Sequence, residues 1–329
     1  MKRTAGIQPF WLLAVIAVGV LPFSGLGTYT LQILTLAGIN AAVAIGLNLV
    51  LGTAGQISLG QAAFVGIGAY TTARLMTGAG VSFWLAMPAG GALAGLIGAA
   101  LGYLALRFQG HYLAMITLCF GLIMHIFFLE FPFLTGGAAG IANIPYAGLL
   151  GHAIDNARDA LFKTFHLSWF LVLLVYWLLN NLTHLGSGRA LAALRDDPIA
   201  AESVGVPTAV YKVQAFTVSA VAAGLAGGVY AVHTHYVGPE LFGVGASLEF
   251  LIIVVIGGLG SPVGAILGAL LMAVLPELMR SYEEYRLLFF AMILMVIVVA
   301  APGGLWGGLS TGVVRIGSAL RRRFGTGGA

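Results

Sequence analysis

Charged residues are scarce in this chain. Of its 329 residues, 8% are charged and 60% are hydrophobic, whereas a soluble globular protein carries about 25% charged residues. A surface that faces water cannot be built from so few charges, so most of the outer surface must face lipid. At about 20 residues per span, the length predicts an all-α, polytopic integral membrane bundle of roughly ten spans.

Cysteine is nearly absent as well. The single cysteine, Cys119, cannot form an intrachain disulfide, so the redox compartment cannot be inferred from it.

The basic residues form no stripe with interleaved aromatics, which argues against nucleic-acid binding. No paired carboxylates, zinc ligands or nucleophile motif gather at the end of a span, so we expect neither a membrane enzyme nor a metal site.

A phosphate-binding loop is also missing. The lysines are Lys2, Lys163 and Lys212, and none of them follows a glycine, which excludes the Gly-x-x-x-x-Gly-Lys-Ser/Thr motif. ATP must therefore be handled by another subunit if the protein depends on it. We expect this chain to bind no cofactor of its own.

Long apolar runs mark the predicted spans. The N-terminal run is interpreted as a span and not as a signal peptide, because Pro22 and Phe23 stand where a cleavage site needs small residues. A later stretch is interrupted between Gly257 and Pro262, and such short broken helices are tolerated where protein buries them. The spans are placed near 10–26, 29–51, 61–78, 83–106, 111–131, 166–184, 213–233, 248–275 and 287–303.

The basic residues at the two ends of the chain predict its orientation. Cytoplasmic flanks of membrane spans are enriched in lysine and arginine, so both termini should be cytoplasmic and the number of spans even. An even number requires 248–275 to cross twice, or once with an additional re-entrant piece. We expect one transmembrane domain over 1–329, with an outer loop at 132–165 and a cytoplasmic loop at 185–212. The terminal basic residues are Lys2, Arg3, Arg315, Arg321, Arg322 and Arg323.

The cytoplasmic loop contains the signals of two short helices. Asp197 can cap the start of the second helix, and Pro198 fits its first position. Gly205 can adopt the left-handed conformation that ends it. A short capped helix between two spans could transmit the movement of a cytoplasmic partner, or it could be an ordinary interfacial helix. The residues inside the helix favour helical structure: Ala200, Ala201 and Glu202.

This loop resembles the coupling loop of ABC importer permeases, whose pattern is Glu-Ala-Ala, three residues and then Gly. Ala200, Ala201 and Gly205 match the pattern, while Ile199 stands where the glutamate would be. A wider resemblance, from about residue 30 to 308, is to the LivM-type permeases of branched-chain amino acid importers. The stretches that carry it are 47–64, 188–212 and 257–261.

The resemblance implies a membrane subunit of an ATP-driven importer in the bacterial cytoplasmic membrane. It implies four kinds of neighbour: two cytoplasmic ATP-binding subunits, a second related permease, a periplasmic substrate-binding protein and the lipid bilayer. The implied substrates are branched-chain amino acids, although other amino acids, amides or urea remain open. Coupling to the ATPases would pass through 189–205. The expected coupling residues are Arg189, Asp197, Pro198, Ala200, Ala201, Glu202 and Gly205.

An amino acid is a zwitterion, so its path through the membrane needs amide, hydroxyl and backbone groups. Broken helices expose such groups, and two glycine-rich segments, 52–60 and 257–264, predict such breaks. The candidate pathway residues are Gln56, Ser58, Gln61 and Ser261, unless they only cap and pack helix ends. A secondary transporter should carry intramembrane charges, which the span centres almost lack. A stand-alone channel would not explain the capped cytoplasmic helix.

Overall fold

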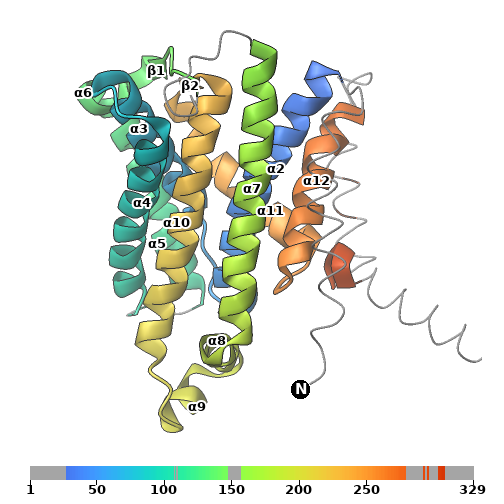
Figure 1. The fold of residues 1–329 in the computed structure, drawn as a ribbon. Coiled ribbons are helices and arrows are strands. Elements are labelled where there is room, and N and C mark those ends of the chain that lie inside the picture. Colours follow the sequence, from blue (N-terminus) through green and yellow to red (C-terminus); the bar gives the residue numbers. More distant parts are fainter. Residues whose placement is uncertain are drawn as a thin grey trace, which may run out of the picture.

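A computed structural model describes residues 27–106, 108, 110–146, 157–278, 292, 295 and 303–307. Within these residues the regular elements are helices, apart from one pair of two-residue strands (Figure 1). The predicted first span, both termini and nearly all of the predicted last span lie outside the described residues.

Six long helices form the bundle, and they follow the apolar runs of the sequence. The first, α2, continues without a break into a short π-helix, η2. Their bounds are α2 Thr28–Asn48, η2 Leu49–Thr53, α3 Gln61–Gly78, α4 Phe83–Ala105, α5 His111–Glu130, α7 Ala157–His184 and α10 Thr208–Thr234.

Two predicted loops are shorter than expected. Helix α7 begins at Ala157, so the predicted outer loop 132–165 loses its last residues to this helix. The reason is tertiary, because Leu161 and Phe165 are buried in a small cluster with Leu31 of α2. The predicted loop 185–212 likewise ends early, because α10 begins at Thr208, whose side chain is buried.

Five of the described helices are long and apolar enough to cross a membrane: α2 with η2, α4, α5, α7 and α10. Helix α3, which was predicted as a span, is not among them. Nearly all of its residues from Gln61 to Met76 are buried inside the bundle, and a helix that protein surrounds does not need a lipid-compatible surface. The coarse prediction of an all-α membrane bundle is therefore confirmed, while its count of ten spans reaches beyond the described residues.

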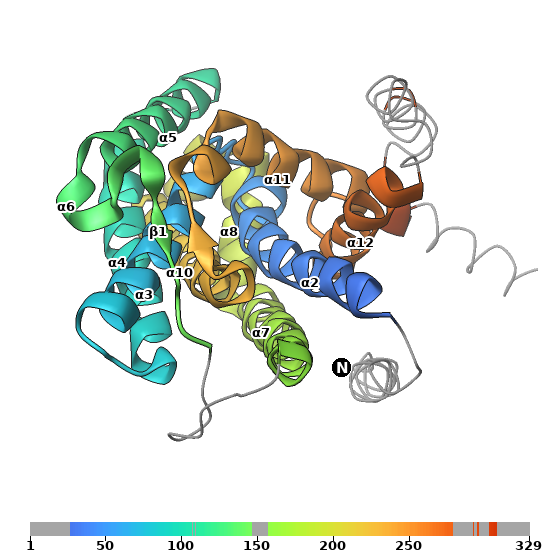
Figure 2. The ribbon, with the colours of Figure 1, turned by 90° about the horizontal axis from the view of Figure 1, so that it is seen from above.

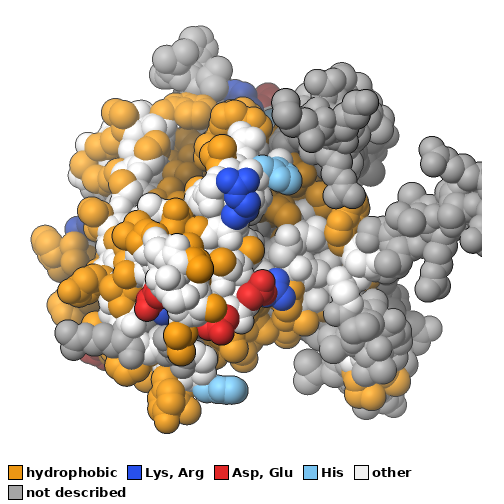
Figure 3. Space-filling view, turned by 90° about the horizontal axis from the view of Figure 1, so that it is seen from below, with side chains coloured by type: hydrophobic (Ala, Val, Ile, Leu, Met, Phe, Trp, Pro, Cys, Tyr) orange, Lys and Arg blue, Asp and Glu red, His pale blue; other side chains and the backbone are white. Residues whose placement is uncertain are grey.

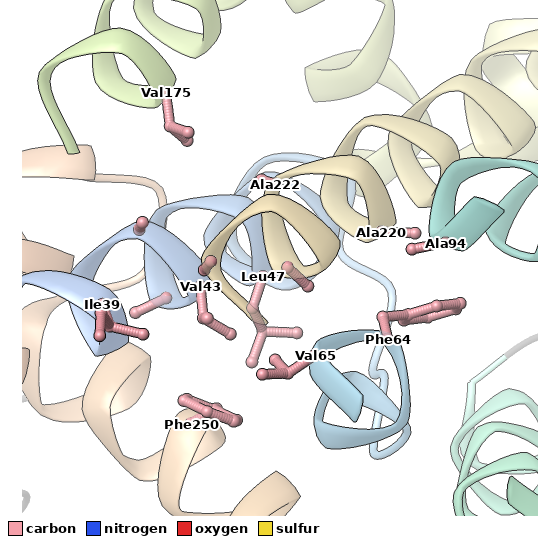
Figure 4. Packing of buried hydrophobic residues seen from close by; sticks show 14 of the residues in the cluster. Ile39, Val43, Leu47, Phe64, Val65, Ala94, Val175, Ala220, Ala222 and Phe250 are labelled. Atoms are coloured by element: carbon pink, nitrogen blue, oxygen red, sulfur yellow. The ribbon is translucent and has the colours of Figure 1, made fainter. Parts of the chain in front are cut away.

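Close contacts between small residues hold the bundle together. Helix α10 packs against α3 and α4, and α2 packs against α7 and α12. A Cβ atom at Gly224 would lie 2.6 Å from the Cβ of Ala94 and 3.0 Å from the Cα of Gly91, so α10 and α4 approach closely only because Gly224 has no side chain. Side chains such as Leu47, Val65 and Ala222 fill the space between α2, α3 and α10 (Figure 4).

One end of the bundle is closed by the strands. After α5 come α6 Pro132–Thr135, η3 Gly137–Ala139 and β1 Ile141–Ala142. Strand β2, Tyr236–Val237, follows α10 and pairs antiparallel with β1, so that Ile141 lies opposite Val237. Together with η4, Pro239–Phe242, these segments lie over the bundle when it is viewed from above (Figure 2). We call this the strand end.

The predicted break near Gly257 is present. Helix α11, Val244–Gly257, and helix α12, Pro262–Leu278, are bent by 120° relative to each other. The hydroxyl of Tyr29 donates to Glu277 Oε2 at 2.5 Å, so the end of α12 lies beside the start of α2. The turn between α11 and α12 lies at the other end of α2, where Asn48 contacts Ser261. The pair therefore runs away from the strand end and returns to it.

Candidate functional site

The end of the bundle opposite the strands carries two short helices, α8 Gly186–Asp196 and α9 Pro198–Ser203. Both were predicted, and the local signals act as expected. The carboxylate of Asp197 accepts hydrogen bonds from the backbone amides of Ile199 at 2.9 Å and Ala200 at 3.1 Å. Gly205 adopts a left-handed φ of 83°, after which the chain turns into α10.

The first of these helices is fixed to the bundle. The hydroxyl of Ser187 donates to the carbonyl oxygen of Leu182 at 2.9 Å, which joins the start of α8 to the last turn of α7. The inner face of α8 is buried, with Leu191 and Leu194 almost inaccessible to solvent. This helix must therefore move together with the ends of α7 and α10.

The second helix projects from the bundle (Figure 1). Ala201 is buried, and the side chain of Glu202 accepts a hydrogen bond from the Thr208 hydroxyl, so one side of α9 is held against α10. On the other side, Ile199 and Val204 are each 78% exposed. These two exposed aliphatic side chains, one in α9 and one directly after it, form a small apolar contact surface.

Charged side chains of α8 and α9 lie at the same end of the bundle. Arg189, Asp196, Asp197 and Glu202 are all exposed. Seen from below, the described charged side chains of this face gather near its centre, and hydrophobic side chains spread around them (Figure 3). Exposed aliphatic and charged side chains therefore lie on the same face, a mixture that protein contact sites commonly have.

Arg195 connects these helices to the membrane bundle. Its Nη1 donates a hydrogen bond of 2.6 Å to the carbonyl oxygen of Gly52, a residue of the π-helix η2. The stem of the same side chain covers Gly55, where a Cβ atom would lie 2.8 Å from Arg195 Cγ. The first glycine-rich segment thus binds an arginine of helix α8.

Asn48 then joins the two glycine-rich segments. Its Nδ2 donates to the carbonyl oxygen of Ser261 at 2.8 Å, and its Oδ1 accepts from the backbone amide of Gly260 at 2.8 Å. Both backbone groups belong to the turn between α11 and α12, where the Ser261 carbonyl oxygen also accepts from the Ala265 amide at 3.1 Å. A Cβ atom at Gly52 would collide with Asn48 Oδ1 and with the Gly260 amide, so this contact requires glycine.

The arrangement forms a continuous physical connection. It runs from α8 through Arg195 to η2, and from η2 through Asn48 to the turn of the broken pair α11–α12. Each step is a hydrogen bond between elements that lie far apart in the sequence. Helix α8 is therefore joined by hydrogen bonds, through Arg195 and Asn48, to the two irregular backbone segments of the bundle.

The predicted pathway residues fall into two groups. Gln61 and Ser261 have structural partners: Gln61 Nε2 donates to Ser219 Oγ at 3.2 Å, and Ser261 Oγ accepts from the Gly264 amide at 3.1 Å. For these two residues the structure favours helix capping and packing. Gln56 Oε1 and Ser58 Oγ are buried and have no hydrogen-bond partner among the described residues, which leaves them available to another group.

Sequence reasoning named neither Asn48 nor Arg195 as a site residue. The signal for Asn48 was a lone amide inside an otherwise apolar run, and polar side chains in spans usually have a specific partner. The signal for Arg195 was weaker, since an arginine at the end of a surface helix is common. In the described part of the chain, no group of three or more His, Cys, Asp or Glu residues is placed to hold a metal ion.

Comparison with known families gives a match over most of the chain. The model of the family described as branched-chain amino acid transport system, permease component, matches residues 29–299. No solved structure shows a significant match.

Individual relatives agree with this match. The chain is 37% identical, over 318 residues, to the high-affinity branched-chain amino acid transport system permease protein LivM of Escherichia coli (strain K12), covering 91% of this chain and 75% of that protein. It is 27% identical over 286 residues to LivH of the same organism, covering 82% and 92%. A shorter similarity, 31% over 134 residues, is to the autoinducer 2 import system permease protein LsrC of Yersinia pseudotuberculosis (serotype O:1b, strain IP 31758), covering 38% and 37%.

Proposed function

Because this chain belongs to the family of permease components of branched-chain amino acid transport systems, we propose that it is one membrane subunit of an ATP-driven importer. The cargo is a branched-chain or closely related amino acid delivered by a periplasmic binding protein. The chain acts as a transporter subunit and not as an enzyme. Two cytoplasmic ATP-binding subunits hydrolyse ATP, and a second related permease completes the membrane part.

The proposed orientation places the α9 end in the cytoplasm and the strand end outside. Arg189, Arg195 and Lys212 all lie at or near the α9 end, in agreement with the excess of basic residues in cytoplasmic loops. We place both termini on the same side, with about ten spans in the bacterial cytoplasmic membrane. The return of α12 to the strand end fits an even number of crossings.

The hydrogen bond between Arg195 and Gly52 is the observation that carries the proposed coupling. The ATP-binding subunits contact the exposed tip of α9 and push on 189–205 when they close around ATP. Since α8 is packed on α7 and α10, the push moves these spans together. Arg195 passes the displacement to η2, and Asn48 passes it to the broken pair, so the bundle changes between its inward- and outward-facing states.

The coupling is tested by Arg195→Ala in the assembled importer. A hydrogen bond from a partly exposed cation contributes about 1 kcal/mol, so we expect roughly fivefold fewer amino acids imported per ATP hydrolysed. The measurement is leucine uptake and phosphate release from the same proteoliposomes. Lys163→Ala is the matched control, because it removes an exposed positive charge at the start of α7. Equal uptake per ATP in Arg195→Ala and in the unmodified importer would contradict the coupling route.

The assembly is tested separately by purification of the tagged chain with its partners. We expect an ATP-binding pair and a second permease to copurify, and we expect the ATP-binding pair to be lost when 198–205 is replaced by a Gly-Ser linker.

Ala201→Arg should uncouple ATP hydrolysis from uptake while membrane insertion stays intact, because Ala201 is the buried residue of α9. A chain that is recovered alone and transports leucine in liposomes without ATP would overturn the importer proposal.

A further inference from the structure

A cavity of about 300 Å³ lies between α2, α3, α10, η4, α11 and α12. This volume is at the lower end of the range of roughly 300–1,000 Å³ for small-molecule sites. Its walls are mostly aliphatic and aromatic. Figure 4 shows three of the wall residues, Ile39, Val65 and Phe250, which come from three different helices.

Three polar side chains also line the cavity: Asn40 of α2, Tyr230 of α10 and Glu249 of α11. None of them makes a hydrogen bond or ion pair with any described residue. They offer one carboxylate, one amide and one hydroxyl to the same space. An apolar chamber with a few converging polar groups is the general form of a site for a small ligand.

Glu249 is the decisive residue. It is the only charged residue from Leu241 to Pro276, and it stands in the second turn of a helix that is otherwise strongly apolar. A carboxylate within a membrane bundle is costly, and such residues usually face a cavity and serve a ligand or ion. In the structure Glu249 is exposed on the single chain and lines the cavity.

We propose that this cavity is a subsite for the amino acid on its way through the permease, an inference that rests on the proposed function. The carboxylate of Glu249 accepts from the substrate ammonium group. The amide of Asn40 and the hydroxyl of Tyr230 donate to the substrate carboxylate. The aliphatic side chain of the substrate lies against Ile39, Phe242 and Phe250, which favours small neutral amino acids with apolar side chains.

The position of the cavity links it to the coupling route. Asn40 and Asn48 belong to the same helix, and Glu249 belongs to the helix that ends at Gly257, beside the turn that Asn48 holds. A displacement of η2 relative to that turn changes how α2 and α11 lie against each other. The same change alters the distance between Asn40 and Glu249, so the subsite can release its ligand when α8 moves.

A second cavity provides a contrast within the same molecule. It has a volume of about 490 Å³ and lies between α3, α4, α5 and α6. Its walls include Ile67, Leu93 and Phe127, and Arg74 is the only charged residue that lines it. None of the residues that line this cavity offers a carboxylate to the ammonium group of the substrate. The cavity therefore serves as an internal control.

The test is ligand protection of a cysteine in the wall of the cavity. In a Cys119→Ser background, Ala246→Cys places a thiol in the proposed subsite, and Thr71→Cys places one in the control cavity. Membrane vesicles that contain the complete importer are treated with a small charged thiol reagent, with and without millimolar leucine. We expect leucine to slow the labelling of Ala246→Cys and to leave Thr71→Cys unchanged.

Two further comparisons assign the polar contacts. Adding Glu249→Gln should raise the leucine concentration needed for half-protection by about tenfold, as the loss of one charge-assisted hydrogen bond predicts. 4-Methylpentanoic acid, which lacks the ammonium group, should not protect. Equal protection by leucine and by this acid would overturn the role of Glu249.

Two outcomes separate this inference from the proposed function. Vesicles that import leucine with ATP while Ala246→Cys is labelled at the same rate with and without leucine would overturn the subsite alone. An Ala246 thiol that never reacts would mean that the cavity is not reached from water in the assembled importer, which also overturns the subsite. Absence of ATP-driven leucine import by the unmodified importer would instead overturn the proposed function.

Discussion

Asn48 shows how a single side chain can organise irregular backbone inside a membrane protein. It is 2% exposed, and its amide group satisfies one donor and one acceptor of the turn at Gly260 and Ser261. Gly260 is exposed and Ser261 is half-buried, so these two hydrogen bonds fix the position of the turn relative to α2. The glycine at position 52 gives the amide the room it needs.

At this scale we predict that Asn48→Ala destabilises the protein by about 1–3 kcal/mol, because it removes two part-buried hydrogen bonds, each of which contributes about 0.5–1.5 kcal/mol. The measurement is the thermal unfolding midpoint of the purified chain in detergent. Asn181→Ala, at an exposed position near the end of α7, is the matched control and should unfold like the unmodified chain. Indistinguishable midpoints for the two variants would show that the turn does not depend on Asn48.

At the scale of elements, α9 is the shorter of the two helices at the end of the bundle opposite the strands. It has six residues, and isolated helices shorter than about 12–15 residues are marginal in water. Its stability must come from its ends and from its neighbours. Asp197 caps its start, the amide of Val206 bonds back to the Ala201 carbonyl at 3.0 Å, and the Thr208 hydroxyl holds Glu202.

Loss of the cap should therefore loosen α9 selectively. We predict that Asp197→Ala costs about 1 kcal/mol, which raises amide hydrogen exchange at Ile199 and Ala200 about fivefold. The neighbouring Asp196→Ala removes an equal charge without removing the cap, so it should leave exchange in α9 unchanged. If both variants accelerate exchange to the same extent, charge and not capping stabilises this helix.

At the scale of the whole molecule, the two ends of the bundle differ in their secondary structure and in their exposed side chains. At the strand end, β1, β2 and η4 cover the bundle. Helix α11 begins at this end, and helix α12 ends there. The α9 end carries the exposed apolar side chains Ile199 and Val204 together with several exposed charged residues of α8 and α9. The two ends are connected through α2, which begins beside Glu277 and continues into the π-helix that receives Arg195.

This polarity predicts which end faces which compartment. In a Cys119→Ser background, Tyr146→Cys at the strand end should react with a membrane-impermeant thiol reagent in intact cells. Val204→Cys at the α9 end should react only after the membrane is opened. Both side chains are exposed, so accessibility and not burial decides the result. The reverse pattern would show that the proposed orientation is wrong.

Local signals determined much of this protein from sequence alone. Apolar runs of sufficient length predicted the helices, since lipid leaves the backbone few alternatives. Asp197, Pro198 and Gly205 predicted the bounds of α9, because capping depends on residues within one turn of a helix end. The glycine-rich interruption between Gly257 and Pro262 likewise predicted the break between α11 and α12.

Only the tertiary structure decided which of these pieces meet. The contact of Arg195 with Gly52 joins residues 143 positions apart, and that of Asn48 with Gly260 joins residues 212 apart. No local pattern encodes such pairs, because they depend on how the helices pack. For the same reason Gln61 and Ser261 proved to have structural partners, and α3 proved to be buried. Glu249 lines a cavity because α2, α10 and α11 border the same space. The sequence of any one of these helices cannot predict that space.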